Sequence, residues 1–158
     1  MRISGACAAL ARTILSTEIC MMKFPLTFSL LLLPGIVQAA SLDVTVTNIP
    51  DATGNIRVAV CTKAEFLQPD CGYHAVLPSR LGQVSVTFPD VQPGVYAIQV
   101  FQDRNGNQKL DQNFLGMPKE PLGFSRNPPM HFGPPRFADA AFSFGSQNSA
   151  VSVALRTK

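Results

Sequence analysis

Three observations predict an all-β fold, an antiparallel two-sheet β-sandwich of about seven strands that follows a signal peptide. Short segments alternate apolar and polar residues, which is the period of a half-buried strand. Turn-forming residues separate these segments, and the chain contains 13 Pro and 11 Gly. No window keeps a helical apolar period for long enough to make a packed helix. Short strands joined by turns are typical of a sandwich.

The first two strands are predicted at residues 42–47 and 55–61, where Val and Ile alternate with polar residues. The Pro, Asp and Gly content of residues 48–54 indicates a turn, so we expect these strands to form a hairpin. Residues 63–67 can form one helical turn. Residues 73–81 show no regular pattern and receive no assignment.

Two further strands are predicted at residues 83–88 and 95–102, and the second is apolar at both odd and even positions. A strand that is apolar on both faces is central in its sheet or covered on both sides. Residues 137–144 and 150–155 supply the last two strand predictions.

The first 39 residues have the layout of an export signal rather than of a folded segment. Residues 21–23 supply a start and a positive charge, residues 24–37 are mainly apolar, and Ala39 ends a small-residue cut site. We expect residues 40–158 to form the domain, located in the periplasm or secreted. The apolar run is too short to span a bilayer, so no transmembrane segment is expected in the mature chain.

Residues 1–20 lie upstream of this signal, and we interpret them as the product of a start site assigned too early. A signal with a long charged region is the alternative. Removal of residues 1–39 leaves ten basic and nine acidic residues, so the formal net charge falls from +3 to +1. No cluster of Lys and Arg remains in the sequence, which argues against nucleic acid as a partner.

The predicted mature chain keeps two cysteines, Cys61 and Cys71. One pair in an exported chain predicts a disulfide. Closing so short a loop stabilises the fold by roughly 2–3 kcal/mol in the chain-entropy estimate. A redox-active pair more often has the spacing Cys-x-x-Cys, so the structural interpretation is preferred.

Short oxygen-bearing side chains occupy alternate positions after the most apolar strand. They match the front half of a calcium loop, with these candidate ligands: Asp103, Asn105, Asn107, the Lys109 carbonyl and Asp111. A carboxylate from elsewhere, Glu120 or Asp139, would complete the shell. Calcium is therefore the one cofactor that the sequence suggests.

Two features separate this loop from an EF-hand. The sixth position holds Gln108 where Gly makes the sharp turn, and the twelfth holds Phe114 where a bidentate Glu is needed. The alternative is an ordinary Asn/Gly/Asp turn held by bonds between its own side chains and backbone. The sequence leaves both interpretations open.

A Pro- and Gly-rich stretch follows, and it carries four aromatic rings: Phe114, Phe124, Phe132 and Phe137. The rings either close one end of the sandwich or form a platform for a sugar, a lipid or a protein partner. Phe124 and Phe132, with the neighbouring Ser125 and His131, are the candidate ligand or partner surface.

Two other constellations have weaker support. Ser125, His131 and Asp139 contain the elements of a catalytic triad, but no nucleophile-elbow sequence accompanies them. The two histidines, His74 and His131, together with nearby methionines could form a soft copper site, although no spacing motif links them.

An ordered series of motifs carries a resemblance over residues 42–155: Pro93-Gly94-Val95-Tyr96, the Asp/Asn loop, Leu115 to Glu120, Gly123-Phe124-Ser125, Gly133-Pro134-Pro135 and Phe137 to Ala140. The chain resembles an uncharacterised family of secreted bacterial proteins, a domain of unknown function. Its Pro-Gly-x-Tyr turn is similar to that of transthyretin-like and carboxypeptidase-regulatory domains, which implies a prealbumin-like fold. The family's loop usually has Gly where this chain has Gln108, and the resemblance implies no activity.

We therefore expect an exported, non-catalytic β-sandwich, a binding or scaffolding module of the cell envelope, stabilised by calcium if the loop binds it. An envelope component or a carbohydrate is the expected partner. The alternative is a small periplasmic enzyme or a metal-handling protein that uses the loops from Asp103 to Asp139.

Overall fold

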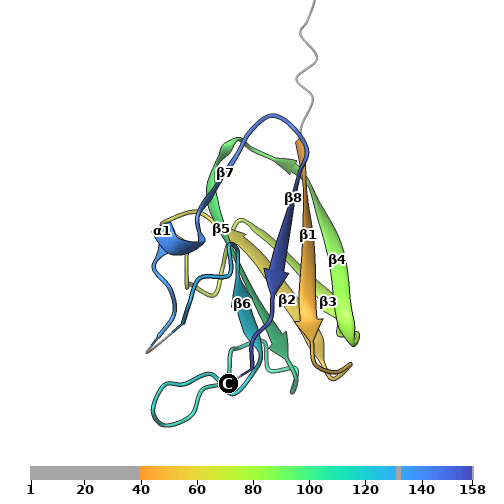
Figure 1. The fold of residues 1–158 in the computed structure, drawn as a ribbon, viewed down its shortest axis with the longest axis vertical. Helices are drawn as coiled ribbons and strands as arrows, with labels where there is room; N and C mark the ends of the chain where they lie inside the picture. The colour runs from red at the N-terminus through yellow and green to blue at the C-terminus, as the bar shows by residue number, and fades with distance from the viewer. Residues whose placement is uncertain (1–39, 131–132, 158) are drawn as a thin grey trace, which may run out of the picture. The chain divides into compact units, whose positions relative to one another are not determined.

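The computed structural model describes residues 40–130 and 133–157, and the predicted signal peptide lies outside them. The domain consists of two packed sheets and almost no helix (Figure 1). The three-stranded sheet has the order β4-β1-β8, with these bounds: β1 (Ala40–Ile49), β4 (Gly82–Val91) and β8 (Ser149–Ala154). β1 pairs with β4 antiparallel and with β8 parallel.

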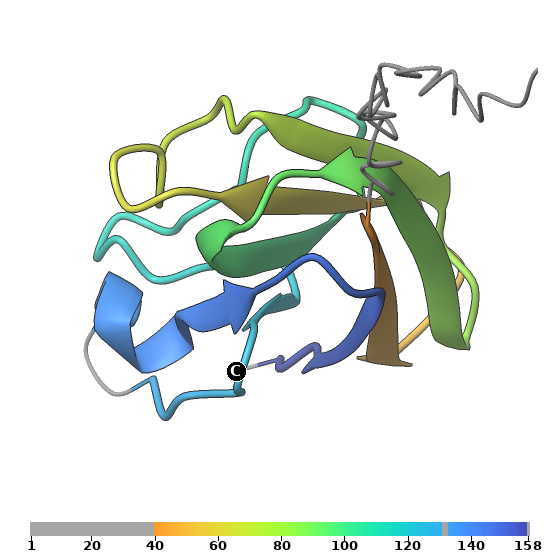
Figure 2. The same ribbon diagram turned by 90° about the horizontal axis from the view of Figure 1, so that it is seen from above.

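The five-stranded sheet has the order β3-β2-β5-β6, and β7 pairs with the first residues of β5. Its members are β2 (Asn55–Cys61), β3 (Tyr73–Pro78), β5 (Gly94–Asp103), β6 (Leu122–Phe124) and β7 (Phe142–Phe144). Seen from above, the strands of the three-stranded sheet run across those of the other sheet (Figure 2). The prediction of an all-β, two-sheet sandwich is confirmed.

Two local predictions are wrong, and one segment without an assignment forms a strand. β1 and β2 do not form a hairpin, because residues 50–54 carry the chain from one sheet to the other. Residues 73–78, which received no assignment, form the edge strand β3. The predicted strand at 137–144 begins instead with the short helix α1 (Phe137–Ala140), since the Asp139 carboxylate accepts hydrogen bonds from both the backbone N–H and the guanidinium of Arg136.

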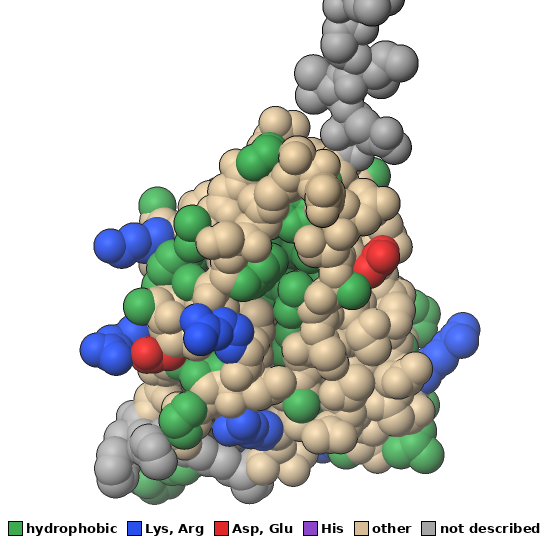
Figure 3. All heavy atoms as spheres, turned by 45° about the horizontal axis from the view of Figure 1, so that its top comes forward, with side chains coloured by type: hydrophobic (Ala, Val, Ile, Leu, Met, Phe, Trp, Pro, Cys, Tyr) green, Lys and Arg blue, Asp and Glu red, His purple; other side chains and the backbone are tan. Residues whose placement is uncertain are grey.

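The main core lies between the sheets and is built from the inward positions of the alternating strands. Val44 and Val46 of β1 face Val58 and Val100 of the other sheet's strands, and all four are at most 2% exposed. Burying each such side chain contributes about 1.5–3 kcal/mol. Figure 3 shows hydrophobic side chains in the hollow centre of one face, with basic side chains around it.

A second, smaller core covers part of the outer face of the five-stranded sheet. It is formed by Phe66, Ala97, Leu122, Phe124 and Ala140, with Phe101, Leu110, Met130 and Phe137 packed against it. β5 is therefore apolar on both faces because both faces are covered, as the sequence predicts.

Among residues 40–130 and 133–157, no helix has the length and apolar character needed to cross a bilayer.

Candidate functional site

Asp103, the last residue of β5, organises the loop that follows. Its side chain is only 1% exposed. Oδ1 accepts from the backbone N–H groups of Gly106 (2.8 Å) and Asn107 (3.1 Å), and Oδ2 accepts from that of Gln108 (2.9 Å). Arg57 Nε donates to the same Oδ2 at 3.1 Å. Four donors therefore hold this buried carboxylate, which fixes residues 103–110, hereafter the base loop.

The remaining predicted ligands are also joined to one another. Asn105 Nδ2 and Asn107 Nδ2 donate to the two carboxylate oxygens of Asp111 at 2.7 and 2.9 Å. The Asn105 Oδ1 accepts from Asn107 N, and the Asn107 Oδ1 accepts from Lys109 N. Glu120, 6% exposed, accepts from the backbone N–H groups of Arg104 and Asp111.

The structure thus brings Asp103, Asn105, Asn107, Lys109, Asp111 and Glu120 together. Their oxygens are of the kind that calcium prefers, but backbone and amide donors already engage the three carboxylates. No group of three His, Cys, Asp or Glu side chains suited to a metal is found in the described ranges. The arrangement fits a self-supporting turn, and calcium binding stays a prediction.

Gln108 occupies the position where the calcium-loop pattern has Gly. Its φ is 66°, in the left-handed region that favours glycine. Its backbone N–H completes the set of donors to Asp103. The loop therefore keeps the turn that Gly usually makes and holds an ordinary side chain in a strained conformation to do so.

The predicted partner surface is corrected by burial. Ser125 is 0% exposed; its hydroxyl donates to the Ala140 carbonyl and accepts from Ile98 N. Phe124 is 5% exposed and packs edge-on against Phe66, with ring centroids 5.8 Å apart. Neither side chain is exposed: backbone groups hold the Ser125 hydroxyl, and Phe124 belongs to the second, smaller core and also lines the groove described below. His131 and Phe132 lie outside the described residues.

Some of the other aromatic and triad candidates are packed or paired, and others are exposed. Phe137 packs on Phe66 with a centroid distance of 5.6 Å, while Phe114 is 94% exposed. Asp139 pairs with Arg136, and the hydrogen bond from that guanidinium lowers the pKa of the Asp139 carboxyl. His74 is exposed, with Nδ1 at 3.4 Å from the Cys71 carbonyl.

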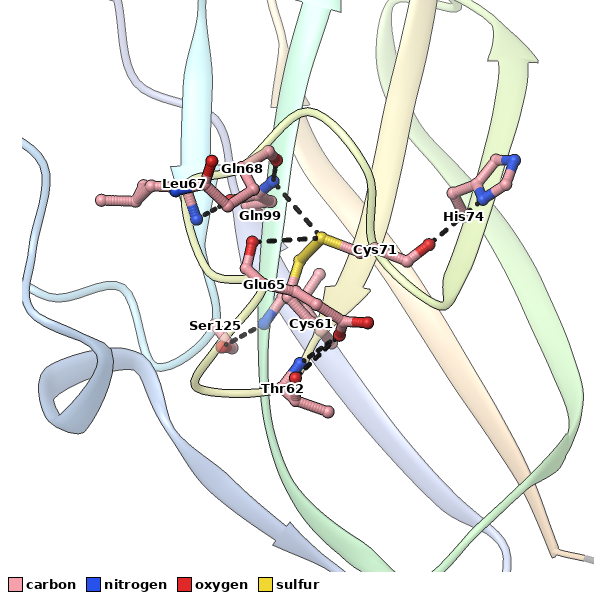
Figure 4. Close-up of a disulfide and its surroundings, with 10 residues drawn as sticks. Cys61, Thr62, Glu65, Leu67, Gln68, Cys71, His74, Gln99 and Ser125 are labelled. Atoms are coloured by element: carbon pink, nitrogen blue, oxygen red, sulfur yellow. Dashed lines mark hydrogen bonds between the residues drawn. A yellow bond between two sulfur atoms is a disulfide. The ribbon is translucent and has the colours of Figure 1, made fainter.

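The predicted disulfide joins Cys61 to Cys71 (Figure 4). Residues 62–70, the disulfide loop, fold over the outer face of the five-stranded sheet. Gln99 of β5 ties this loop down, because its amide accepts from Leu67 N and donates to the Gln68 carbonyl. Hydrogen bonds from Thr62 lower the pKa of Glu65 inside the loop.

A groove of about 990 Å³ lies on this outer face. The sequence did not predict the groove itself, but three residues of the predicted calcium and partner sites line it: Lys109, Glu120 and Phe124. Its lining includes Ala59, Val76 and Phe101 of the sheet, and Arg57 beside them. The disulfide loop and residues 108–118 also line it, so two loops wall an apolar floor. Its volume lies in the range of ligand pockets in proteins.

The sequence held a partial signal for this groove. The outward positions of β2, β3 and β5 bring Arg57 level with Val76 and Phe101 in the strand register. The two-faced apolar character of β5 predicts a covered outer face. The loops leave part of that face open. Their tertiary packing decides which part, and no local sequence pattern predicts it.

Comparison with families of known proteins gives one match, over residues 44–152, to the family described as uncharacterized protein conserved in bacteria (DUF2141). Curated proteins and solved structures give no match. The matched segment covers more than two thirds of the sequence and nearly all strands of the sandwich. The chain therefore belongs to the DUF2141 family, an uncharacterised family conserved in bacteria.

Proposed function

We propose that this chain is an exported, non-catalytic binding module of the bacterial cell envelope, and that its ligand occupies the groove on the five-stranded sheet. The observation that carries the proposal is the groove itself, about 990 Å³ of space with an apolar floor and two guanidinium groups, those of Arg57 and Arg156, in its lining. Concave apolar sites with a few polar groups are the usual form of small-ligand sites.

The lining favours a ligand with an apolar body and one anionic group. Arg57, Lys109 and Arg156 supply positive charge, and Asp70 and Glu120 supply negative charge. Two backbone N–H groups already bind the Glu120 carboxylate. Among the described residues, Arg57 has a partner only at Nε, so the rest of its guanidinium is available to a carboxylate or phosphate.

The geometry supports binding better than acyl transfer. Ser125 is fully buried, and both of its hydrogen bonds go to backbone groups. Asp139, the third member of the triad hypothesis, is held by Arg136 instead of by a histidine. A nucleophile needs an accessible oxygen and a base within hydrogen-bond reach, and Ser125 lacks the first.

The binding proposal can be tested with a dansyl-labelled long-chain carboxylate and protein recovered from the periplasm. We expect a blue shift and increased emission on binding. Val76→Glu places a carboxylate in the groove at a position 50% exposed, and it should weaken binding at least tenfold. Val95→Glu is the matched control, because Val95 is 53% exposed on β5 and does not line the groove.

The anionic group has its own test. We expect the free carboxylate to bind roughly tenfold more tightly than its methyl ester, because a charged hydrogen bond to Arg57 is lost in the ester. Arg57→Gln should remove this preference. Equal binding of acid and ester would indicate a neutral ligand. Competition by oligosaccharides and not by fatty acids would indicate a carbohydrate ligand.

Export has a direct test. A mature chain that begins at Ala40, recovered from the periplasmic fraction and sequenced from its amino terminus, is the expected result. Recovery of the chain from the cytoplasm with Met1 or Met21 still present would contradict the export proposal and leave the groove proposal unchanged.

Calcium at the base loop is a separate part of the proposal. A cation would take over Asp111 from the two Asn amides that now bind it, and its binding would raise the free energy of unfolding. At about ten times the Kd this increase is about 1.4 kcal/mol. Thermal unfolding in calcium and in chelator measures it, and Asp111→Asn should abolish it. Identical Tm values would remove the ion from the proposal.

A further inference from the structure

Residues 111–119, hereafter the finger, form a hairpin that closes on itself. Lys119 N donates to the Asp111 carbonyl at 2.8 Å, and Asn113 N donates to the Met117 carbonyl at 2.8 Å. The Asn113 side-chain oxygen accepts from the backbone N–H groups of Leu115 and Met117. These backbone N–H groups of the turn are therefore paired within the finger, and no other segment is needed to bind them. The finger extends from the sandwich as the teal loop of Figure 1.

The tip of the finger carries a contiguous apolar patch. Phe114 is 94% exposed, Leu115 is 68% exposed and Met117 is 39% exposed. Of the other large exposed hydrophobic side chains in the described part of the chain, Leu67 and Val76 line the groove, and Leu81 and Val95 do not. Contiguous apolar groups held in water at a loop tip mark an interaction site, whereas single ones do not.

Hydrogen bonds hold the base of the finger in place. Glu120 binds the backbone N–H groups of Arg104 and Asp111, at the two ends of the segment that leads into the finger. Asn105 and Asn107 hold the side chain of Asp111. The apolar tip is thus presented by a segment whose polar groups are already paired.

The charges at the foot of the finger select the partner. Lys109 and Lys119 are exposed on either side of it. The nearby carboxylates keep their negative charge but are less exposed than the lysines, because Glu120 is 6% exposed and Asp111 is half-buried. Apolar side chains with lysines close by in the chain are typical of segments that insert into the interface of an anionic bilayer, where the apolar groups meet acyl chains and the lysines meet headgroups.

We propose that the finger docks this protein onto the surface of an anionic lipid bilayer, with Phe114 and Leu115 inserted among the acyl chains and Lys109 and Lys119 at the headgroups. This goes beyond the proposed function and does not depend on it. Leu115 and Met117 also line the groove, so docking would bring the mouth of the groove to the bilayer.

Vesicle flotation of the purified, disulfide-bonded protein tests the proposal. We expect binding to vesicles that contain phosphatidylglycerol, and at least tenfold weaker binding to phosphatidylcholine vesicles. The Phe114→Ser/Leu115→Ser variant should lose at least tenfold in affinity. Lys109→Gln/Lys119→Gln should lose roughly tenfold at low salt. Leu81→Ser is the matched control, because Leu81 is 75% exposed and lies away from the finger.

The chain contains no Trp, so a single introduced Trp is a clean probe. Emission from Phe114→Trp should shift to the blue on vesicle binding and be quenched by brominated acyl chains, while Leu81→Trp should be unaffected. Val76→Glu should bind vesicles normally, which separates docking from the groove. Absence of vesicle binding, equal binding by the Ser variant, or self-association that Phe114→Ser abolishes would overturn the proposal.

Discussion

The connection between β5 and β6 has two halves of opposite character. In the base loop, side-chain oxygens accept backbone and amide hydrogens, and the buried Asp103 alone takes four donors. In the finger, the backbone is equally well paired, but the large apolar side chains are left in water. The difference indicates a division of roles, in which the first half supports and the second half contacts something outside the fold.

Asp103→Ala should have the largest effect on stability. It removes the acceptor of three backbone N–H groups and leaves Arg57 without its partner, so we expect a loss of about 3–4 kcal/mol. Phe114→Ser in the finger should change the free energy of unfolding by less than about 0.5 kcal/mol. Urea unfolding of both variants measures the contrast. Similar losses would mean that the two halves do not differ as described.

Gly54→Ala should come next. Gly54 has a φ of 69°, and a Cβ there would overlap the Asp103 carbonyl oxygen. We expect a cost of about 2–3 kcal/mol from strain and overlap. Gly106→Ala is the control, because Gly106 also has positive φ but a Cβ would meet open space, and it should cost about 1 kcal/mol.

Gln108→Gly should stabilise the base loop. Gln108 holds a left-handed conformation with φ 66°, which costs a side-chain-bearing residue about 1 kcal/mol more than glycine. The greater freedom of glycine in the unfolded chain offsets part of this gain, so we expect a rise of about 0.5 kcal/mol in the free energy of unfolding. A loss of stability would show that the Gln108 side chain has a role that its backbone does not explain.

The smallest expected effect concerns pH. The Asp51 carboxylate accepts from Thr53 N and also pairs with Arg104 of the base loop, and these contacts lower its pKa, the Thr53 backbone bond most of all. A depressed folded-state pKa stabilises the fold above the unfolded-state pKa, and this contribution is lost as the pH falls through the folded value. Asp51→Asn should flatten the decline of Tm below about pH 4, and a carbon-detected NMR titration should show the low pKa directly.

Local sequence pattern predicted most of the strands, because alternation reports which face of a segment is buried. It could not report strand partners. β1 lies beside β4 and β8, whereas the turn predicted at residues 48–54 indicated β2 as its neighbour. β6 escaped notice because it has three residues, and its Gly123 lies so close to the Ala154 carbonyl that no larger side chain would fit.

The candidate site was predictable only in part. The alternate Asp and Asn residues predicted a cluster of oxygens after β5, and the structure brings those residues together. Burial of Ser125 and Phe124 depends on the return of the chain through Ala140 and on the position of Phe66, so their neighbours in sequence could not predict it. The exposed tip at Phe114 likewise required the hairpin geometry.

The parallel pairing of β1 with β8 sets the order of events in folding. The contact between Ser41 N and the Asn148 side chain joins positions 107 residues apart, so β1 keeps one unpaired edge until β8, the last strand of the chain, pairs with it. A chain stopped before Ser149 would expose that edge of β1 to pairing with other chains. The three-stranded sheet is therefore completed only when the last strand of the chain joins it, and until then this edge of β1 remains open to chaperones and to aggregation.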